Sequence, residues 1–153
     1  MSTTADTLPA EPITIREARR DDSDRAFELL KQVASTYAPD REAFENSFAE
    51  LTGEGTSSLV LVAESSGSVV GYALTTISSL LHTNGKSAQL QELVVDNAYR
   101  GSGVGTALLE ALESVCRERK VRQLTVVSSR GSADFYERLG YRSTADFLKR
   151  TFD

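Results

Sequence analysis

The sequence predicts an α/β fold in which helices cover both faces of a mixed β-sheet. Three β-type runs follow one another between residues 58 and 95, and helical runs precede and follow them. Strands joined by short connections form a sheet, and helices on either side of them in the chain cover its two faces. A length of 153 residues suits one domain. We therefore expect a single domain over residues 13–153, with residues 1–12 as a disordered tail.

The N-terminal part is expected to supply one strand and two helices. Residues 13–18 alternate apolar and polar side chains, as a short strand does. Asp21 and Asp22 can cap a helix that Pro39 stops. A second helix is expected over residues 41–51, where two glycines soon follow.

The middle of the chain carries the strands of the sheet. Residues 58–64 and 69–76 are expected to pair as a hairpin through the turn Ser65-Ser66-Gly67-Ser68. A loop over residues 80–86 then leads to a third strand over residues 90–95.

The C-terminal part begins with a helix that opens at Val104. Its apolar residues recur at helical spacing; they are Val104, Ala107, Leu108, Ala111, Leu112, Val115 and Cys116. Cys116 is the one cysteine, so it is expected to be a small buried hydrophobe. A strand over residues 122–128, a short helix over 133–139 and a final strand over 141–152 complete the expected order.

A glycine-dense turn, DNAYRGSGVGT, joins the third strand to this helix. Glycine allows positive φ and close approach of a ligand, and the first amides of a helix lack intrahelical acceptors. Such amides suit a phosphate or pyrophosphate. A P-loop would need a lysine after its last glycine, where Thr106-Ala107 follows Gly105. The dinucleotide fingerprint would need a third glycine where Thr106 stands.

The pattern Arg100-x-x-Gly103-x-Gly105 after an apolar strand resembles the acetyl-CoA motif of the GNAT superfamily of N-acetyltransferases. A second block, SADFYERLGY, is similar to the later segment of that superfamily, in which a short helix carries a tyrosine and ends at Gly-Phe or Gly-Tyr. The two blocks have the family's order and separation, and the resemblance covers roughly residues 12–152. Within the superfamily the chain looks most like small-amine acetyltransferases, including the aminoalkylphosphonate type.

The resemblance implies acetyl-CoA as co-substrate and the GNAT fold, a mixed, splayed sheet flanked by helices on both faces. In that fold the strand containing residues 93–95 and the strand containing residues 124–127 diverge beyond a bulge, and the pantetheine lies between them. The cofactor-binding residues that the resemblance implies are Leu93, Val94, Val95, Arg100, Gly101, Ser102, Gly103, Val104, Gly105, Thr106, Ser132 and Phe135. No metal site is expected.

The chemistry so implied needs a base, because a lysine-like amine with a pKa near ~10.4 is almost fully protonated at neutral pH. Glu92 is the acid nearest the opening, but in a regular strand residues 89, 91 and 93 share a face and Glu92 lies on the other. A bulge could turn it inward. Several relatives carry an acid where Gln89 and Gln91 stand here, so His82, the single histidine, is the other candidate. A free amine taken from solution is the third possibility.

A proton donor for the departing thiolate is also useful. The resemblance gives that role to Tyr136, since a phenol with a pKa of ~10 can protonate a thiolate of pKa ~8.5. The amide of Val94 or Val95 can stabilise the negative charge on the carbonyl oxygen. Ser132 stands where many relatives carry an asparagine, and a serine makes fewer hydrogen bonds to the cofactor arm.

Composition narrows the partners. The net charge is −5 and both signs are mixed along the chain, which disfavours nucleic acid and anionic membranes. The sequence has no apolar run of membrane-spanning length, so a cytoplasmic location is expected. A homodimer stays open.

The leading hypothesis is an acetyl-CoA-dependent N-acetyltransferase that acts on a primary amine of a small molecule by direct attack in a ternary complex. One alternative is an acyl-CoA-binding sensor without robust catalysis, which the glutamines at 89 and 91 favour and Tyr136 disfavours. The other is acetylation of a protein N-terminus or lysine, which is the same chemistry with a wider acceptor cleft.

Overall fold

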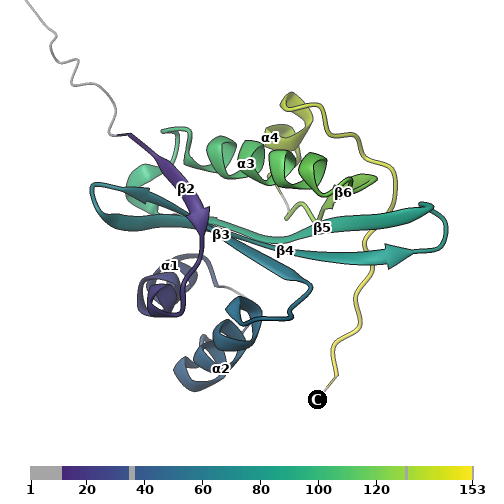
Figure 1. Cartoon of the computed structure of the whole chain (residues 1–153). Coiled ribbons are helices and arrows are strands. Elements are labelled where there is room, and N and C mark those ends of the chain that lie inside the picture. Colours follow the sequence, from purple (N-terminus) through teal and green to yellow (C-terminus); the bar gives the residue numbers. More distant parts are fainter. Residues whose placement is uncertain (1–11, 35–36, 130, 153) are drawn as a thin grey trace, which may run out of the picture.

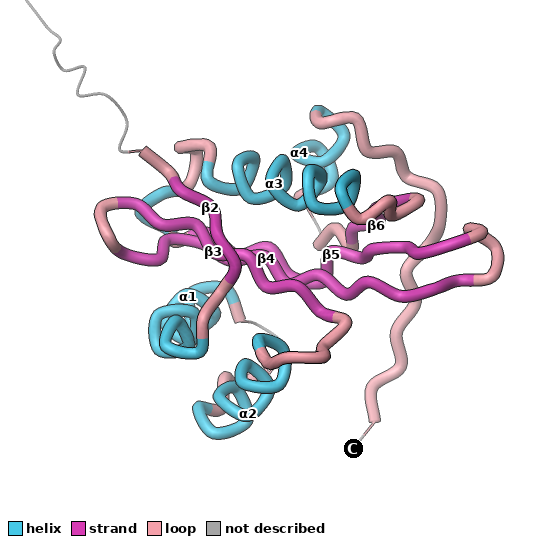
Figure 2. The backbone as a smooth tube through the Cα atoms, in the orientation of Figure 1, coloured by secondary structure: helices cyan, strands magenta, loops and turns pink. Residues whose placement is uncertain are grey.

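The computed structural model describes residues 12–34, 37–129 and 131–152, so nearly all of the expected tail lies outside the described residues. Figure 1 shows three layers, with helices on both faces of a central sheet. The tube in Figure 2 shows the same arrangement, in which the sheet runs between the two helical layers. The α/β fold with helices on both faces is thus confirmed. The helices of one face are α1 (Ser23–Val33) and α2 (Arg41–Thr52), and those of the other are α3 (Val104–Glu118) and α4 (Ala133–Arg138).

The described residues form one sheet in the order β2-β3-β4-β5-β6. Its strands are β2 (Thr14–Glu17), β3 (Ser58–Ser65), β4 (Ser68–Leu80), β5 (Gly85–Val95) and β6 (Gln123–Val126). Neighbouring strands are antiparallel except β5 and β6, which are parallel. The expected β3–β4 hairpin is present, and Ser66 and Gly67 take φ values of 53° and 76°. Two positive φ values are typical of the turn that matches the twist of a two-residue hairpin.

The connection between β4 and β5 is shorter than the loop expected over residues 80–86. Leu80 pairs with Gly85, so only residues 81–84 form the turn. The Thr83 hydroxyl donates to the Gly85 carbonyl at 2.9 Å. This extension of β4 and β5 could not be predicted from the sequence, because most of the residues involved are polar. The hydrogen bonds that extend the two strands are made by backbone groups, which every residue has.

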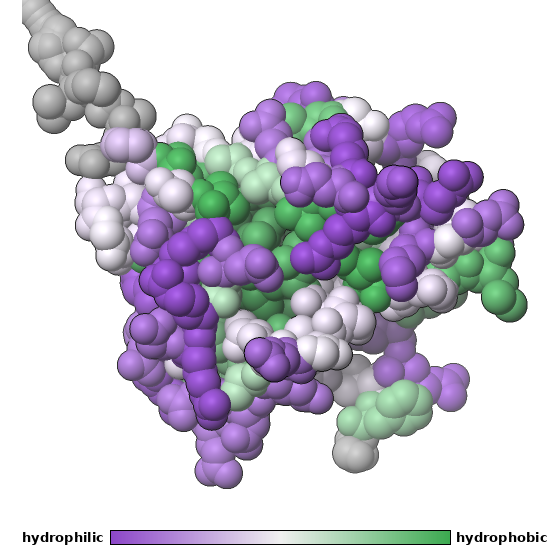
Figure 3. All heavy atoms as spheres, viewed as in Figure 1, coloured by the Kyte–Doolittle hydropathy of each residue, from purple (hydrophilic) through white to green (hydrophobic). Residues whose placement is uncertain are grey.

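Two apolar clusters hold the layers together, one on each face of the sheet. The α3 face includes Leu59, Leu61, Val70, Leu90, Leu108 and Leu112. The face of α1 and α2 includes Leu29, Phe48, Val60, Val62, Tyr72 and Val94. In β3 the residues alternate strictly between the two clusters, Leu59 and Leu61 on one face and Val60 and Val62 on the other, as the two-residue period of a strand requires. In Figure 3 apolar atoms are visible between the layers and hydrophilic atoms cover much of the outside. Cys116 is buried in the α3 cluster, as expected.

The start of α1 depends on Asp22 in a way that differs from simple capping. Asp22 occupies the N-cap position without a capping bond to the helix. Its carboxylate instead accepts from the Arg19 amide at 2.7 Å and from the Arg16 guanidinium at 2.8 Å. The bond from Arg16 is the main reason that the pKa of Asp22 lies below its usual value.

We expect Asp22→Asn to destabilise the protein by about 2 kcal/mol at pH 7, because the guanidinium of Arg16, whose side chain is 20% exposed, loses one of its two carboxylate partners and keeps only Glu64. A lowered folded-state pKa stabilises the fold above the unfolded pKa of ~3.9, and this contribution disappears as pH falls through the folded value. Denaturant titrations should therefore show the difference from wild type shrinking as pH falls below about 4. The control is Asp21→Asn, whose 86% exposed side chain should change stability little.

The final strand expected over residues 141–152 is wrong. These residues form no strand in the described structure, and beyond Tyr141 their backbone amides donate no hydrogen bond to a described backbone group. Side chains of Phe147, Leu148 and Phe152 are 68%, 88% and 82% exposed. The composition suits a strand, but a strand also needs a neighbouring edge, and a cavity of about 1100 Å³ lies between β6 and this segment.

None of the helices within the described ranges is both long and apolar enough to cross a membrane. The cytoplasmic location expected from the sequence stays a prediction.

Candidate active site

The sheet opens between β5 and β6. Their ladder pairs residues 87–90 of β5 with β6 and ends at Leu90 and Val126. A last, long contact joins the Val127 amide to the Leu90 carbonyl at 3.5 Å. Residues 91–95 of β5 continue beside β4 alone, so one edge of this stretch has no strand partner in the described structure. Free backbone groups on such an edge can accept an extended ligand as an added strand.

A β-bulge at the same point decides which way Glu92 faces. The β4–β5 register passes from Thr75↔Leu90 to Leu74↔Glu92, which leaves Gln91 without a paired residue. Leu90 and Leu93 therefore both pack against the α3 cluster, although three residues separate them. The bulge inverts the alternation that residues 89, 91 and 93 would follow in a regular strand, and it places Glu92 beside Leu74 on the face of α1 and α2.

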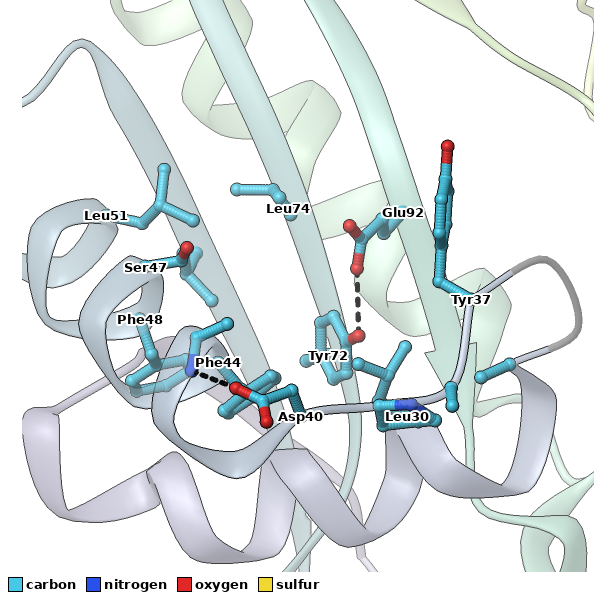
Figure 4. Close-up of a pocket in the computed structure, with 15 residues that line it drawn as sticks. Leu30, Tyr37, Asp40, Phe44, Ser47, Phe48, Leu51, Tyr72, Leu74 and Glu92 are labelled. Carbon is cyan, nitrogen blue, oxygen red and sulfur yellow. Dashed lines mark hydrogen bonds between the residues drawn. The ribbon is translucent and has the colours of Figure 1, made fainter. Parts of the chain in front are cut away.

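Glu92 lies at a pocket of about 500 Å³ between the sheet and helices α1 and α2. Figure 4 shows its carboxylate at the pocket, with the Tyr72 ring beside it. The Tyr72 hydroxyl donates to Glu92 Oε1 at 2.9 Å. Burial, together with the negative charge of Glu92, raises the pKa of Tyr72 far above its usual value. Tyr72 therefore stays a proton donor and holds Glu92 in one orientation, with the second carboxylate oxygen left for another partner.

The glycine turn presents free amides next to this strand. Gly101 and Gly103 have φ values of 78° and 91°, and the space where their Cβ atoms would lie is open. Among the described residues, no acceptor pairs with the amides of Gly101, Gly103, Val104, Gly105 or Thr106. These amides and the N-terminus of α3 together form a site that suits an anion.

Gly105 has a different role from its two neighbours. A Cβ on Gly105 would meet the Phe135 ring at 3.4 Å, so this glycine lets α4 pack closely on α3. Phe135 is thereby fixed against the start of α3. Arg100 is exposed and forms no ion pair within the described residues, so its charge is available at the turn.

Helix α1 fixes the entry to the turn. The Arg25 guanidinium pairs with Asp96, and its Nε donates to the Val69 carbonyl at 2.8 Å. Asp96 in turn accepts from the Ala98 amide, which is the main cause of its lowered pKa. Gln32 accepts from the Asn97 amide at 2.8 Å. These contacts hold the turn against the sheet before any ligand is bound.

A family model described as "Acetyltransferase (GNAT) domain" matches residues 21–150 of the chain. The chain belongs to the GNAT acetyltransferase family. This confirms the family that the glycine motif and the tyrosine block indicate. Members of the family use acetyl-CoA, so the edge of β5 and the turn that follows it are the parts of this GNAT domain to compare with a CoA-binding site.

Individual relatives agree with this assignment. Glucosamine 6-phosphate N-acetyltransferase from Arabidopsis thaliana is 27% identical over 94% of this chain and 99% of its own. The crystal structure of the Arabidopsis enzyme has a TM-score of 0.80 at 25% identity, covering 94% of this chain and 100% of its own. A structure described as a transcriptional regulator from Bacillus halodurans C-125 has a TM-score of 0.84 at 23% identity, covering 92% and 100%, and it shows the shared fold alone. The finer likeness to aminoalkylphosphonate acetyltransferases stays a prediction.

Tyr136 lies on the other face of the sheet from Glu92. It is 7% exposed on α4, where its ring packs edge-on against Phe135 and Tyr141. Burial raises its pKa. Its hydroxyl has no hydrogen-bond partner among the described residues, and Tyr136 lines the cavity beside β6 rather than the pocket of Glu92. The opening between β5 and β6 is a gap in the sheet itself, so it separates the face that carries Tyr136 from the face that carries Glu92.

Two further predicted residues have other surroundings in the structure. The Ser132 hydroxyl donates to the Ser129 carbonyl at 2.7 Å and so closes the turn before α4. His82 is exposed at the tip of the β4–β5 hairpin and lines neither pocket. Because a strand rises about 3.3 Å per residue, the tip is more than about 20 Å from Glu92 along β5. The structure does not bring His82 and Glu92 together.

Tyr72 and the pocket walls were missed by sequence reasoning. Tyr72 and Glu92 are 20 positions apart and meet only because the bulge sets their register. The contact between Tyr72 and Glu92 could have been predicted by aligning the sequences of β4 and β5 as antiparallel neighbours with one bulged residue at Gln91.

Proposed function

We propose that this GNAT domain transfers the acetyl group of acetyl-CoA to a primary amine of a small molecule by direct attack in a ternary complex. The observation that carries the proposal is that residues 91–95 of β5 join two half-sites. One end holds Glu92 at the pocket between the sheet and helices α1 and α2, and the other leads through an unpaired edge into the free amides of the glycine turn.

Each residue would act on a stated atom. Glu92 accepts the proton that the ammonium group loses, and the freed lone pair forms the C–N bond at the thioester carbonyl carbon. A free amide of Val94 or Val95 donates to the carbonyl oxygen while it carries negative charge. When the C–S bond breaks, Tyr136 gives its proton to the sulfur. Burial raises the pKa of Tyr136, so the phenol carries its proton at neutral pH but is a weaker acid than an exposed tyrosine.

A thermal-shift comparison tests the cofactor part of the proposal. Acetyl-CoA and CoA should raise the melting temperature well above the shift given by ATP or NAD at the same concentration, because the turn offers backbone amides and lacks the lysine of a P-loop. An equal shift with ATP would contradict the assignment. Release of free thiol from acetyl-CoA that requires an added amine then tests the reaction.

Tyr136→Phe is expected to lower kcat by about 10²-fold while acetyl-CoA binding is unchanged, because the ring is kept and only the proton donor is lost. Single-turnover kinetics measure the effect. Tyr141→Phe is the matched control, since the Tyr141 hydroxyl donates to Glu113 at 2.5 Å and should affect stability rather than rate. Equal rates for wild type and Tyr136→Phe would make Tyr136 a structural residue.

The proposal includes a homodimer. It is supported by the free edge of β6 and by the exposed apolar side chains of the C-terminal segment, which a second copy could cover. Light scattering of the full chain should give twice the chain mass of 16.6 kDa, and the mass of a single chain would contradict the dimer.

A further inference from the structure

The walls of the pocket at Glu92 are mainly apolar. β3 and β4 supply Val60 and Leu74, α1 supplies Leu30, and α2 supplies Phe44, Phe48 and Leu51. Phe44 stacks on Phe48 at 5.6 Å between ring centroids and meets the Phe27 ring edge-on at 5.3 Å. These aromatic contacts fix the α2 wall, and Figure 4 shows Phe44 and Phe48 among the residues that line the pocket. A preformed apolar wall favours a ligand that brings apolar surface of its own.

The charged groups at the pocket are both acidic. Asp40 and Glu92 line it, and no lysine, arginine or histidine is among its described lining residues. Asp40 already accepts from the Ala43 amide at 2.8 Å and caps α2. Glu92 is therefore the charge left to pair with a ligand.

Cations on the neighbouring helices are already engaged elsewhere. Arg25 pairs with Asp96, and Lys31 with Glu28. Arg41 pairs with Asp24 at 2.9 Å and stacks over the Phe27 ring at 4.3 Å. None of the three lines the pocket. An anionic group placed there would face Glu92 without a cation to neutralise it.

We infer that the acceptor is a primary amine on an apolar alkyl or arylalkyl body, and that sugar phosphates and phosphonates are excluded. The inference rests on the proposed function and names the substrate class of that site. The ammonium pairs with Glu92, while the apolar body packs between Leu74 and the Phe44 wall. The acceptor thus differs from the substrate that gives the Arabidopsis relative its name.

The test is a series of unbranched amines from propylamine to hexylamine, with glucosamine 6-phosphate and 2-aminoethylphosphonate as anionic competitors. Thiol release from acetyl-CoA is followed with the full chain. Each buried methylene adds about 0.8 kcal/mol of transfer free energy, so kcat/KM should rise up to about fourfold per carbon until the pocket is full. Hexylamine should exceed glucosamine 6-phosphate at least a hundredfold. A flat series, or a phosphate-bearing amine as the best substrate, would overturn the inference.

A matched pair of variants locates the effect. Leu74→Asn keeps the side-chain size but makes the wall polar, so it should reduce the dependence on chain length by at least half. Leu80→Asn makes the same change at the hairpin tip, outside the pocket, and should keep the wild-type series. An unchanged series in Leu74→Asn would overturn the inference.

Binding without turnover separates this inference from the proposed function. Thermal shifts by the same amines, without acetyl-CoA, should grow with chain length in wild type and less so in Leu74→Asn. If that growth is found while no amine releases thiol, the proposed function fails and the assignment of the pocket to apolar amines is supported. If thiol release is found but follows phosphate or phosphonate groups, the assignment fails and the function is supported.

Discussion

Glu92→Gln is expected to lower kcat/KM at pH 7 by about 10²- to 10³-fold. A glutamine cannot take the proton, so the variant must use the fraction of acceptor that is already neutral. For an amine with a pKa near ~10.4, that fraction is less than 10⁻³ at neutral pH. The deficit should shrink about tenfold for each unit of rising pH below the amine's pKa, because the neutral amine increases by that factor. Measuring kcat/KM between pH 7 and pH 9.5 gives this dependence.

The control for this experiment is His82→Ala. His82 is exposed at the hairpin tip, so its removal should change kcat/KM less than twofold at every pH. The opposite pattern, with a large loss in His82→Ala and none in Glu92→Gln, would move the base to His82. Equal activity of both variants and wild type would mean that the neutral amine comes from solution and that the protein only orients it.

Gly103→Val is expected to abolish the thermal shift by acetyl-CoA, with at least a hundredfold loss of affinity. Gly103 has φ 91°, which a β-branched residue adopts only with strain. The valine methyl groups would also fill the open space next to the free amides of the turn, where a pyrophosphate has to approach. Isothermal titration with CoA measures the loss.

Strain alone is controlled by Gly55→Val. Gly55 has φ 77° and equally open surroundings, but it lies in the turn after α2 and not in the glycine turn before α3. The two variants should lose similar stability, and only Gly103→Val should lose CoA affinity. Similar losses of affinity in both would show that the effect is general destabilisation.

Local patterns were enough for most helices and strands of the fold and for the glycine turn. The turn could be read because its requirements lie within 14 consecutive residues: a strand end, glycines that tolerate positive φ, and a helix start with free amides. The same holds for the β3–β4 hairpin, where Ser66-Gly67 defines the turn type by itself. The final strand failed, because its existence depends on an edge elsewhere in the molecule and not on the sequence of residues 141–152.

The pocket at Glu92 could not be predicted in this way. Its walls come from α1, α2, β3, β4 and β5, and no local pattern records which side chains of these elements meet. The sequence also left open on which face of the sheet the Glu92 side chain lies, for a related reason. One unpaired residue, Gln91, inverts the alternation of β5, and a bulge is a property of two strands in register rather than of one.

The contacts of α1 constrain how the protein can change its substrate range. Arg25 and Gln32 of this helix hold the start of the glycine turn, and Leu30 of the same helix lines the pocket that we propose for the acceptor. A mutation that shifts α1 to admit a new amine therefore also displaces the entry to the turn. Helix α2 supplies Phe44, Ser47 and Leu51 to the pocket, and among the described residues it has no hydrogen bond or ion pair to the turn. If the pocket binds the acceptor as proposed, evolution and directed mutagenesis can vary acceptor specificity through α2 while the glycine turn stays in place.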